Sequence, residues 1–106
     1  MTLIDTHCHL YSDEFTNDVA AIIARAQSQG VTKFYLPAID SSTLQAMLAV
    51  EAQYPNEVFA MMGLHPCYVK ENYKTELNII ANELVKRDFV AMGEIGLDFY
   101  WDKIFA

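Results

Sequence analysis

The chain has 106 residues, enough for one domain of ordinary size but too few for a second hydrophobic core. It is 53% hydrophobic and 20% charged, which is typical of a globular protein and excludes a disordered or fibrous one. The formal net charge of -7 opposes non-specific binding to nucleic acid, unless some acidic side chains hold divalent cations that present positive charge to a phosphate.

No apolar run approaches the roughly 20 residues that span a bilayer, and the N-terminus has no basic export signal. The two cysteines, Cys8 and Cys67, are too few for a disulfide framework, so we expect reduced thiols that serve as small core side chains. We therefore predict a soluble, cytoplasmic protein with no membrane partner and a single domain over residues 1–106.

The first elements alternate between strand and helix. A short buried strand is predicted over residues 3–5, followed by a loop over residues 11–15. After a cap near Thr16 or Asn17, apolar residues at three- and four-residue spacing predict an amphipathic helix that ends at Gly30. The apolar positions of this helix are Val19, Ile22, Ile23 and Ala26.

The same alternation continues to the end of the chain. Residues 33–39 are predicted to form a second strand, and residues 40–42 cap a second helix that runs to about Gln53. A third strand is predicted over residues 58–62 and a fourth over residues 89–92. Between them lies a third helix with apolar residues Leu77, Ile80, Ala81, Leu84 and Val85.

Apolar strands joined by amphipathic helices predict an α/β fold with a parallel sheet and right-handed crossovers, in the order βαβαβαβ. Ligands of such folds gather at the carboxyl ends of the strands. Polar candidates follow the end of each predicted strand in this chain: His7 and His9, Asp40, His65 and Glu94.

His7 and His9 are one residue apart beside the first strand. Because side chains alternate along a strand, both rings are expected to point the same way while Cys8 points to the other face. One cation can then meet both neutral imidazoles, which suit Zn, Fe, Ni or Mn. A solvated or hydrogen-bonded histidine pair is the alternative. The collection of all three histidines at two strand ends favours a metal site.

Three segments together resemble the TatD-type metal-dependent deoxyribonucleases, which are (β/α)₈ TIM barrels of the amidohydrolase-like group. The segments are Asp-Thr-His-Cys-His-Leu at residues 5–10, Gly-Leu-His-Pro at 63–66 and Gly-Glu-Ile-Gly-Leu-Asp-Phe-Tyr at 93–100. They occur in the family's order and at its approximate spacing. The resemblance implies that the chain forms the first four β/α units of such a barrel.

The resemblance also implies a site and an activity. His7, His9 and Glu94 would be metal ligands, with Glu94 bridging two divalent cations such as Mg, Mn or Zn, and the reaction would be hydrolysis of DNA phosphodiester bonds. His65 would lie near the substrate phosphate, where it could donate a hydrogen bond or protonate the leaving group; a structural histidine packed against Pro66 is the alternative. We expect the ligand atoms of His7, His9 and Glu94 to lie within about 5 Å of one another.

Other residues near these segments have two interpretations each. Asp5 and Asp98 could orient a ligand imidazole or could hydrogen-bond the backbone of a turn. Phe99, Tyr100 and Trp101 could stack on exposed bases or could pack over the barrel mouth.

The family's barrel has roughly twice this length, and later strands supply two further histidines and an aspartate. This chain stops near residues 103–106, where a fourth helix would begin, so we expect a truncated half-barrel that is weakly active or inactive alone. Its open sheet edges would invite self-association. Two other functions remain open. The first is hydrolysis of C–N bonds, but Glu94 argues against it because many such enzymes have a carboxylated lysine at that place. The second is a non-catalytic product.

Overall fold

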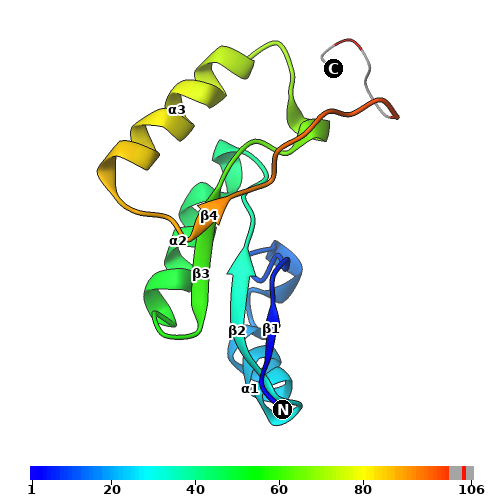
Figure 1. The fold of residues 1–106 in the computed structure, drawn as a ribbon, viewed down its shortest axis with the longest axis vertical. Helices are drawn as coiled ribbons and strands as arrows, with labels where there is room; N and C mark the ends of the chain where they lie inside the picture. Colours follow the sequence, from blue (N-terminus) through cyan, green and yellow to red (C-terminus); the bar gives the residue numbers. More distant parts are fainter. Residues whose placement is uncertain (101–103, 105–106) are drawn as a thin grey trace.

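The computed structural model describes residues 1–100 and 104 of the chain (Figure 1). Its parallel sheet has the strand order β1-β2-β3-β4, with each strand beside its neighbour in sequence. The strands are β1 (Leu3–Asp5), β2 (Val31–Leu36), β3 (Val58–Met62) and β4 (Ala91–Met92). The helices that join them are α1 (Val19–Ser28), α2 (Leu44–Gln53) and α3 (Tyr73–Lys86). The predicted βαβαβαβ order is therefore confirmed.

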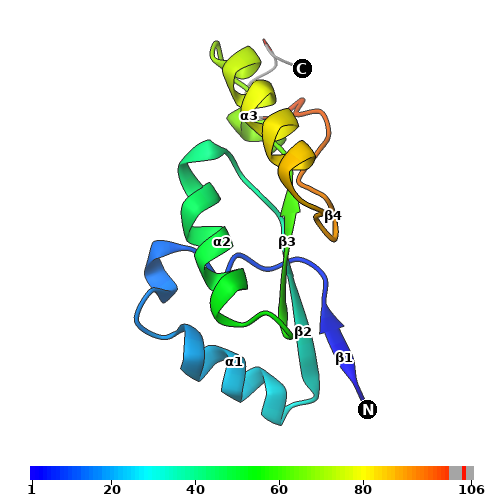
Figure 2. The ribbon, with the colours of Figure 1, turned by 90° about the vertical axis from the view of Figure 1, so that its left-hand side faces the viewer.

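The main core lies between the strands and the helices that cover one side of them (Figure 2). β3 is buried along nearly its whole length, and Val58 and Met62 have almost no exposed surface, which explains the unbroken apolar run in this segment. Met47 of α2 is fully buried against the same layer. Among the described residues, no helix is long and apolar enough to cross a membrane.

The prediction that the first strand is buried is wrong. All three residues of β1 are exposed, and the side chains of Leu3 and Ile4 keep 43% and 48% of their accessible surface. The reason is position: β1 is an edge strand that pairs only with β2.

Several predicted boundaries move by a few residues. β2 spans residues 31–36 instead of 33–39, and it ends where Pro37 lacks the amide needed to continue the ladder. β4 is shorter than the predicted strand over residues 89–92. α2 is preceded by a 3₁₀ turn over Ser41–Thr43, and the side chain of Asp40 caps this turn by accepting from the amide of Ser42. The predicted loop over residues 11–15 contains another 3₁₀ turn, Asp13–Phe15. Gly30 ends α1 as predicted, with a φ of 94°.

Two buried or half-buried carboxylates join α2 and α3 to neighbouring segments. The buried carboxylate of Glu76 in α3 accepts hydrogen bonds from the amide and hydroxyl of Ser41, at 3.0 and 2.8 Å. The carboxylate of Glu51 in α2 accepts from the amide of Ala60 in β3 at 2.6 Å and from the guanidinium of Arg87 at the end of α3. These contacts link α3 to the turn before α2, and α2 to β3 and to the end of α3.

Candidate metal centre

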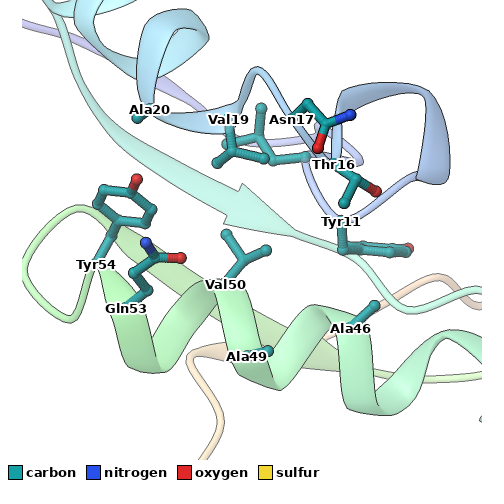
Figure 3. Close-up of a pocket in the computed structure, with 11 residues that line it drawn as sticks. Tyr11, Thr16, Asn17, Val19, Ala20, Ala46, Ala49, Val50, Gln53 and Tyr54 are labelled. Atoms are coloured by element: carbon teal, nitrogen blue, oxygen red, sulfur yellow. The ribbon is translucent and has the colours of Figure 1, made fainter.

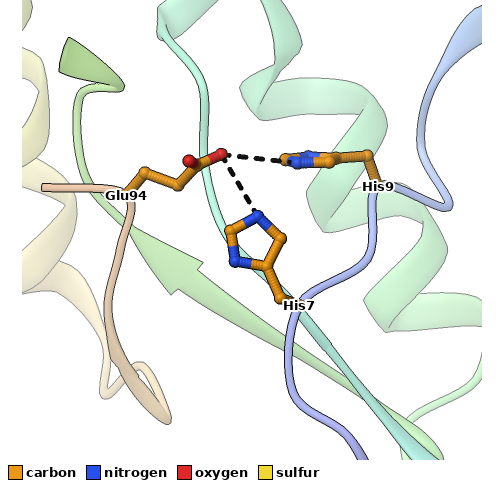
Figure 4. Close-up of side chains that lie close together, drawn as sticks. All are labelled: His7, His9 and Glu94. Atoms are coloured by element: carbon orange, nitrogen blue, oxygen red, sulfur yellow. Dashed lines mark ion pairs between the residues drawn. The ribbon is translucent and has the colours of Figure 1, made fainter. Parts of the chain in front are cut away.

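Side chains from the two edges of the sheet meet above the carboxyl ends of the strands. Nε2 of His7 lies 3.6 Å and Nε2 of His9 lies 3.3 Å from Oε2 of Glu94, as Figure 4 shows. One ligand atom from each residue falls within 4.8 Å of the others. Glu94 is more than 80 residues away from the two histidines in sequence. The predicted proximity of the three side chains is therefore confirmed.

A turn after β1, not the strand itself, presents the two histidines. β1 ends at Asp5, and Oδ1 of Asp5 accepts a hydrogen bond from the amide of His7 at 3.1 Å. This favours the backbone interpretation of Asp5 over the orientation of an imidazole. The two rings pack edge to face with their centroids 5.2 Å apart, so they still point to a common side.

Backbone hydrogen bonds to residues at or just after the ends of two neighbouring strands hold Glu94 in place. The amide of Gly93 donates to the carbonyl of Met62, and the amide of Glu94 donates to the carbonyl of Ala38, each at 3.0 Å. Gly63 allows this close passage, because a Cβ at that position would lie 2.5 Å from the carbonyl oxygen of Glu94 and 2.7 Å from the carbonyl carbon of Gly93. The carboxylate of Glu94 is 18% exposed and faces the histidines.

His65 lies on the other side of the same carboxylate. Its Nε2 is 3.1 Å from Oε1 of Glu94, whereas His7 and His9 face Oε2. Nδ1 of His65 accepts a hydrogen bond from the amide of Cys67 at 3.0 Å, so the neutral ring carries its proton on Nε2. This nitrogen is therefore a hydrogen-bond donor that points into the site, in contrast to a metal ligand, which needs a lone pair.

His9 has a further partner that the sequence did not predict. Its Nδ1 lies 2.8 Å from the hydroxyl of Tyr11, which donates to the carbonyl of Pro37 at 2.6 Å. Tyr11 was predicted only as the start of a loop, although its spacing from His9 repeats the spacing of His9 from His7. Burial raises the pKa of Tyr11, with Glu94 adding to the effect, so the phenol keeps its proton.

Burial also acts on His9 itself. It lowers the pKa of the imidazole; Glu94 opposes this shift, while His7 and His65 reinforce it. The net direction favours the neutral ring, which is the form of histidine that binds metals.

The donor set fits a divalent cation. Two imidazole nitrogens and a carboxylate oxygen suit Zn or Mn, and three protein ligands leave positions open for water or substrate. Two ligands at about 2.1 Å from a tetrahedral ion are about 3.4 Å apart. The two Nε2–Oε2 separations of 3.3 and 3.6 Å bracket that value, whereas the widest separation among the three ligand atoms, 4.8 Å, is longer.

The remaining predicted candidates lie outside this group. Asp40 caps the turn before α2 by accepting from the amide of Ser42. Asp98 accepts a hydrogen bond from the amide of Tyr100, which favours the backbone interpretation. Cys8 is half-buried against the core, and burial raises the pKa of its thiol to about 12, with Asp5 adding to the effect, so it is a small packing residue as expected.

The three aromatic residues after the fourth strand are only partly described. Phe99 and Tyr100 are 63% and 78% exposed. Trp101, the third member of the expected group, lies outside the described residues.

A separate groove of about 430 Å³ lies between α1 and α2 (Figure 3). Val19 and Ala20 line it from α1, and Ala46, Ala49 and Val50 line it from α2. Tyr11 lies at one end of the groove. Its ring packs between the helices, and its hydroxyl contacts His9.

The fold is thus a parallel β/α half-barrel with two histidines after its first strand and a glutamate after its fourth. The family described as TatD related DNase matches residues 4–104 of the chain. The chain therefore belongs to the TatD family, and the predicted resemblance is confirmed.

Individual relatives agree with this assignment. The uncharacterized metal-dependent hydrolase YjjV of Escherichia coli K12 is 36% identical over 101 residues, covering 93% of this chain and 39% of the relative. The 3'-5' ssDNA/RNA exonuclease TatD of Pantoea ananatis is 28% identical over 97 residues, covering 92% of this chain and 37% of the relative. The chain thus spans about two fifths of the length of these curated relatives.

The fold matches a solved structure equally well. The crystal structure of E. coli YjjV superposes with a TM-score of 0.87 at 35% sequence identity, covering 97% of this chain and 40% of that one. The predicted fold class, the first four units of a TIM-type barrel, is therefore confirmed.

Proposed function

We propose that this chain provides the metal-binding half of a TatD-type phosphodiesterase, which hydrolyses DNA or a related nucleic acid. The observation that carries the proposal is the meeting of His7, His9 and Glu94, whose ligand atoms lie within 4.8 Å of one another at the carboxyl ends of β1 and β4. The names of the relatives support the same reaction class, since they include a metal-dependent hydrolase and a single-stranded DNA and RNA exonuclease.

Each residue has a distinct role in this proposal. His7 and His9 would hold a cation through Nε2 together with Oε2 of Glu94, whose other oxygen, Oε1, faces Nε2 of His65. When bound, divalent cations polarise the phosphodiester, generate hydroxide from water and stabilise the leaving oxygen. His65 donates its Nε2 proton in a hydrogen bond to a phosphoryl oxygen or to the leaving group.

The charge of the protein also supports a role for bound cations in substrate binding. The net charge of -7 repels a phosphate backbone, and the carboxylate of Glu94 adds to this repulsion at the site. Cations held by Glu94 would reverse the local sign, so substrate binding should depend on the metal. We propose Mg²⁺, Mn²⁺ or Zn²⁺ for this role.

Metal binding can be measured on the 106-residue chain. We expect titration calorimetry with Mn²⁺ and Zn²⁺ to show binding that weakens by more than about tenfold in Glu94→Gln, because even residues that only support a ligand contribute that much to affinity. Glu71→Gln makes the same chemical change at an exposed position before α3 and should leave binding unchanged. Equal affinities for wild type and Glu94→Gln would refute the site.

The substrate class requires a complete barrel. A chimera that joins this chain to the remaining part of E. coli YjjV would supply it, because the two structures superpose over 97% of this chain. We expect the chimera to cleave single-stranded oligonucleotides in a metal-dependent manner and to leave dihydroorotate and hydantoin intact. The opposite preference would show that the protein is a C–N hydrolase.

A further inference from the structure

The hydroxyl of Tyr11 lies between a ring nitrogen of His9 and a backbone carbonyl. Its oxygen is 2.8 Å from Nδ1 of His9 and 2.6 Å from the carbonyl oxygen of Pro37. Both distances are within the ordinary range of hydrogen bonds. Tyr11 is 5% exposed and Pro37 is fully buried, so their hydrogen bond lies in the core, whereas the His9 side chain is 29% exposed.

The number of available protons decides the direction of both bonds. A tyrosine hydroxyl has one proton, and the carbonyl of Pro37 can only accept. The hydroxyl therefore donates to Pro37, because two oxygens at 2.6 Å without a proton between them would repel each other. Nδ1 of His9 must then carry a proton and donate it to the tyrosine oxygen.

With its proton on Nδ1, the neutral ring of His9 has a lone pair on Nε2. This nitrogen is 3.3 Å from Oε2 of Glu94, which also offers only lone pairs when ionised. Two acceptors that face each other at this distance repel each other unless a proton or a metal cation lies between them. The hydrogen bond from Nδ1 therefore prepares Nε2 for the cation rather than for a bond to Glu94.

We propose that Tyr11 is a positioning residue, whose hydroxyl is fixed by the carbonyl of Pro37 and holds His9 in the tautomer that leaves Nε2 free to bind the metal. The proposal deepens the proposed function and depends on it for the identity of the ligand. The rings of His9 and Tyr11 stand edge to face, at 84° and with centroids 5.6 Å apart, so the hydrogen bond also fixes the orientation of the imidazole.

His65 provides an internal reference in the same site. Its Nδ1 accepts from the amide of Cys67, so the proton of its neutral ring is on Nε2. Two histidines that face one carboxylate therefore have opposite tautomers: His9 presents a lone pair and His65 presents a donor. A single spectrum of the metal-free protein can observe both.

The first experiment needs no metal. Long-range ¹H–¹⁵N correlation spectra of the imidazole nitrogens, recorded at about pH 8 where unperturbed histidine is neutral, assign the tautomer of each ring. We expect the proton on Nδ1 of His9 and on Nε2 of His65. A wild-type spectrum with the His9 proton on Nε2 overturns the proposal, and this result requires no variant to fold.

The second experiment removes only the hydroxyl. In Tyr11→Phe the ring still fills its place, but Nδ1 of His9 loses its acceptor, so the His9 tautomer should shift toward Nε2–H while His65 keeps its own. Zn²⁺ affinity should fall by about tenfold or more, as is usual when the partner of a ligand histidine is removed. Tyr54→Phe is the matched control, since Tyr54 lines the same groove without contacting His9.

The outcomes separate this proposal from the proposed function. If Tyr11→Phe keeps the His9 tautomer and the Zn²⁺ affinity of wild type, Tyr11 has only a packing role and the proposal is wrong. If the tautomers behave as expected but the wild-type chain binds neither Zn²⁺ nor Mn²⁺, the hydrogen-bond assignment holds and the proposed metal site fails.

Discussion

At the scale of single residues, Gly63 has a specific steric role. It follows β3 directly, and the backbone of Gly93 and Glu94 passes over it so closely that a side chain has no room. The absence of a side chain at Gly63 is therefore what allows the backbone of Glu94 to lie at the carboxyl end of the sheet.

We predict that Gly63→Ala displaces Glu94 and weakens Mn²⁺ binding by about tenfold or more, because a Cβ would lie 2.5 Å from backbone that cannot move aside as a flexible side chain can. Calorimetric titration measures the effect. Gly93→Ala is the comparison, since its Cβ would lie at least 3.6 Å from Pro37 and Met61 and should be accommodated. Equal losses in the two variants would contradict this explanation.

At the scale of elements, Glu51 connects α2, β3 and the end of α3. Burial disfavours its ionised form, but hydrogen bonds from Arg87 and from the amide of Ala60 outweigh this and hold the pKa of Glu51 below its usual value. The guanidinium of Arg87 also lies 4.3 Å from the centre of the Phe89 ring, which leads into β4.

We predict that Arg87→Met lowers the free energy of unfolding by about 1–2 kcal/mol at neutral pH, a value reduced because Arg87 is partly exposed. A carboxyl whose folded-state pKa is lowered contributes stability above its unfolded pKa, and that contribution disappears as the pH falls through the folded value. The difference between wild type and variant should therefore shrink on acidification below pH 4.5, the ordinary value for Glu51. Urea unfolding over a pH series measures it.

The neighbouring Lys86 provides the control for this prediction. It pairs with Glu83 at 3.3 Å, but its side chain is 68% exposed. Lys86→Met removes the same charge one residue away and should change the free energy of unfolding by less than about 0.5 kcal/mol at any pH. A pH-dependent loss in Lys86→Met equal to that in Arg87→Met would mean that net charge, and not the contact with Glu51, is responsible.

At the scale of the whole molecule, the segments that follow the two edge strands carry the candidate metal ligands, and exposed apolar side chains lie in and after β4. Met92 in β4 and Ile95 after it are 55% and 68% exposed, and Leu97 is 67% exposed. Exposed apolar side chains next to an unpaired strand edge favour association with another chain. In the solved relative, about three fifths of the chain lies beyond the part that this chain matches.

We predict that the 106-residue chain has at most weak metal-stimulated nuclease activity, because it spans only about two fifths of the length of its relatives and the resemblance implies further ligands from later strands. Glu94→Ala should then change its activity little. In the chimera with the rest of E. coli YjjV, the same substitution should lower kcat/KM by about a hundredfold or more. Initial rates on single-stranded oligonucleotides with Mg²⁺, Mn²⁺ and Zn²⁺ test both statements.

The opposite result has a clear meaning. If the 106-residue chain cleaves as fast as the chimera and loses this activity in Glu94→Ala, a complete site must form from more than one copy. Sedimentation at increasing protein concentration should then show an oligomer whose formation accompanies the activity.

Local pattern in the sequence determined the order of the elements and the site residues that follow them. The spacing of apolar residues predicted α1 and its end at Gly30, and the unbroken apolar run of residues 58–62 predicted β3. Parallel strands place their carboxyl ends together, so topology predicted that His7, His9, Asp40, His65 and Glu94 lie at one end of the sheet. The resemblance to the TatD family then singled out His7, His9 and Glu94, whose ligand atoms the structure brings together. These features depend on short-range periodicity and on one general rule of packing.

Tertiary contacts decided the rest. The exposure of β1 depends on its place at the sheet edge, which the composition of Leu3 and Ile4 does not reveal. The tautomer of His9 depends on the carbonyl of Pro37, 28 residues away, and the position of Glu94 depends on the missing side chain of Gly63. Hydrogen-bond direction and steric fit are properties of atoms brought together by folding, so only the three-dimensional structure could determine them.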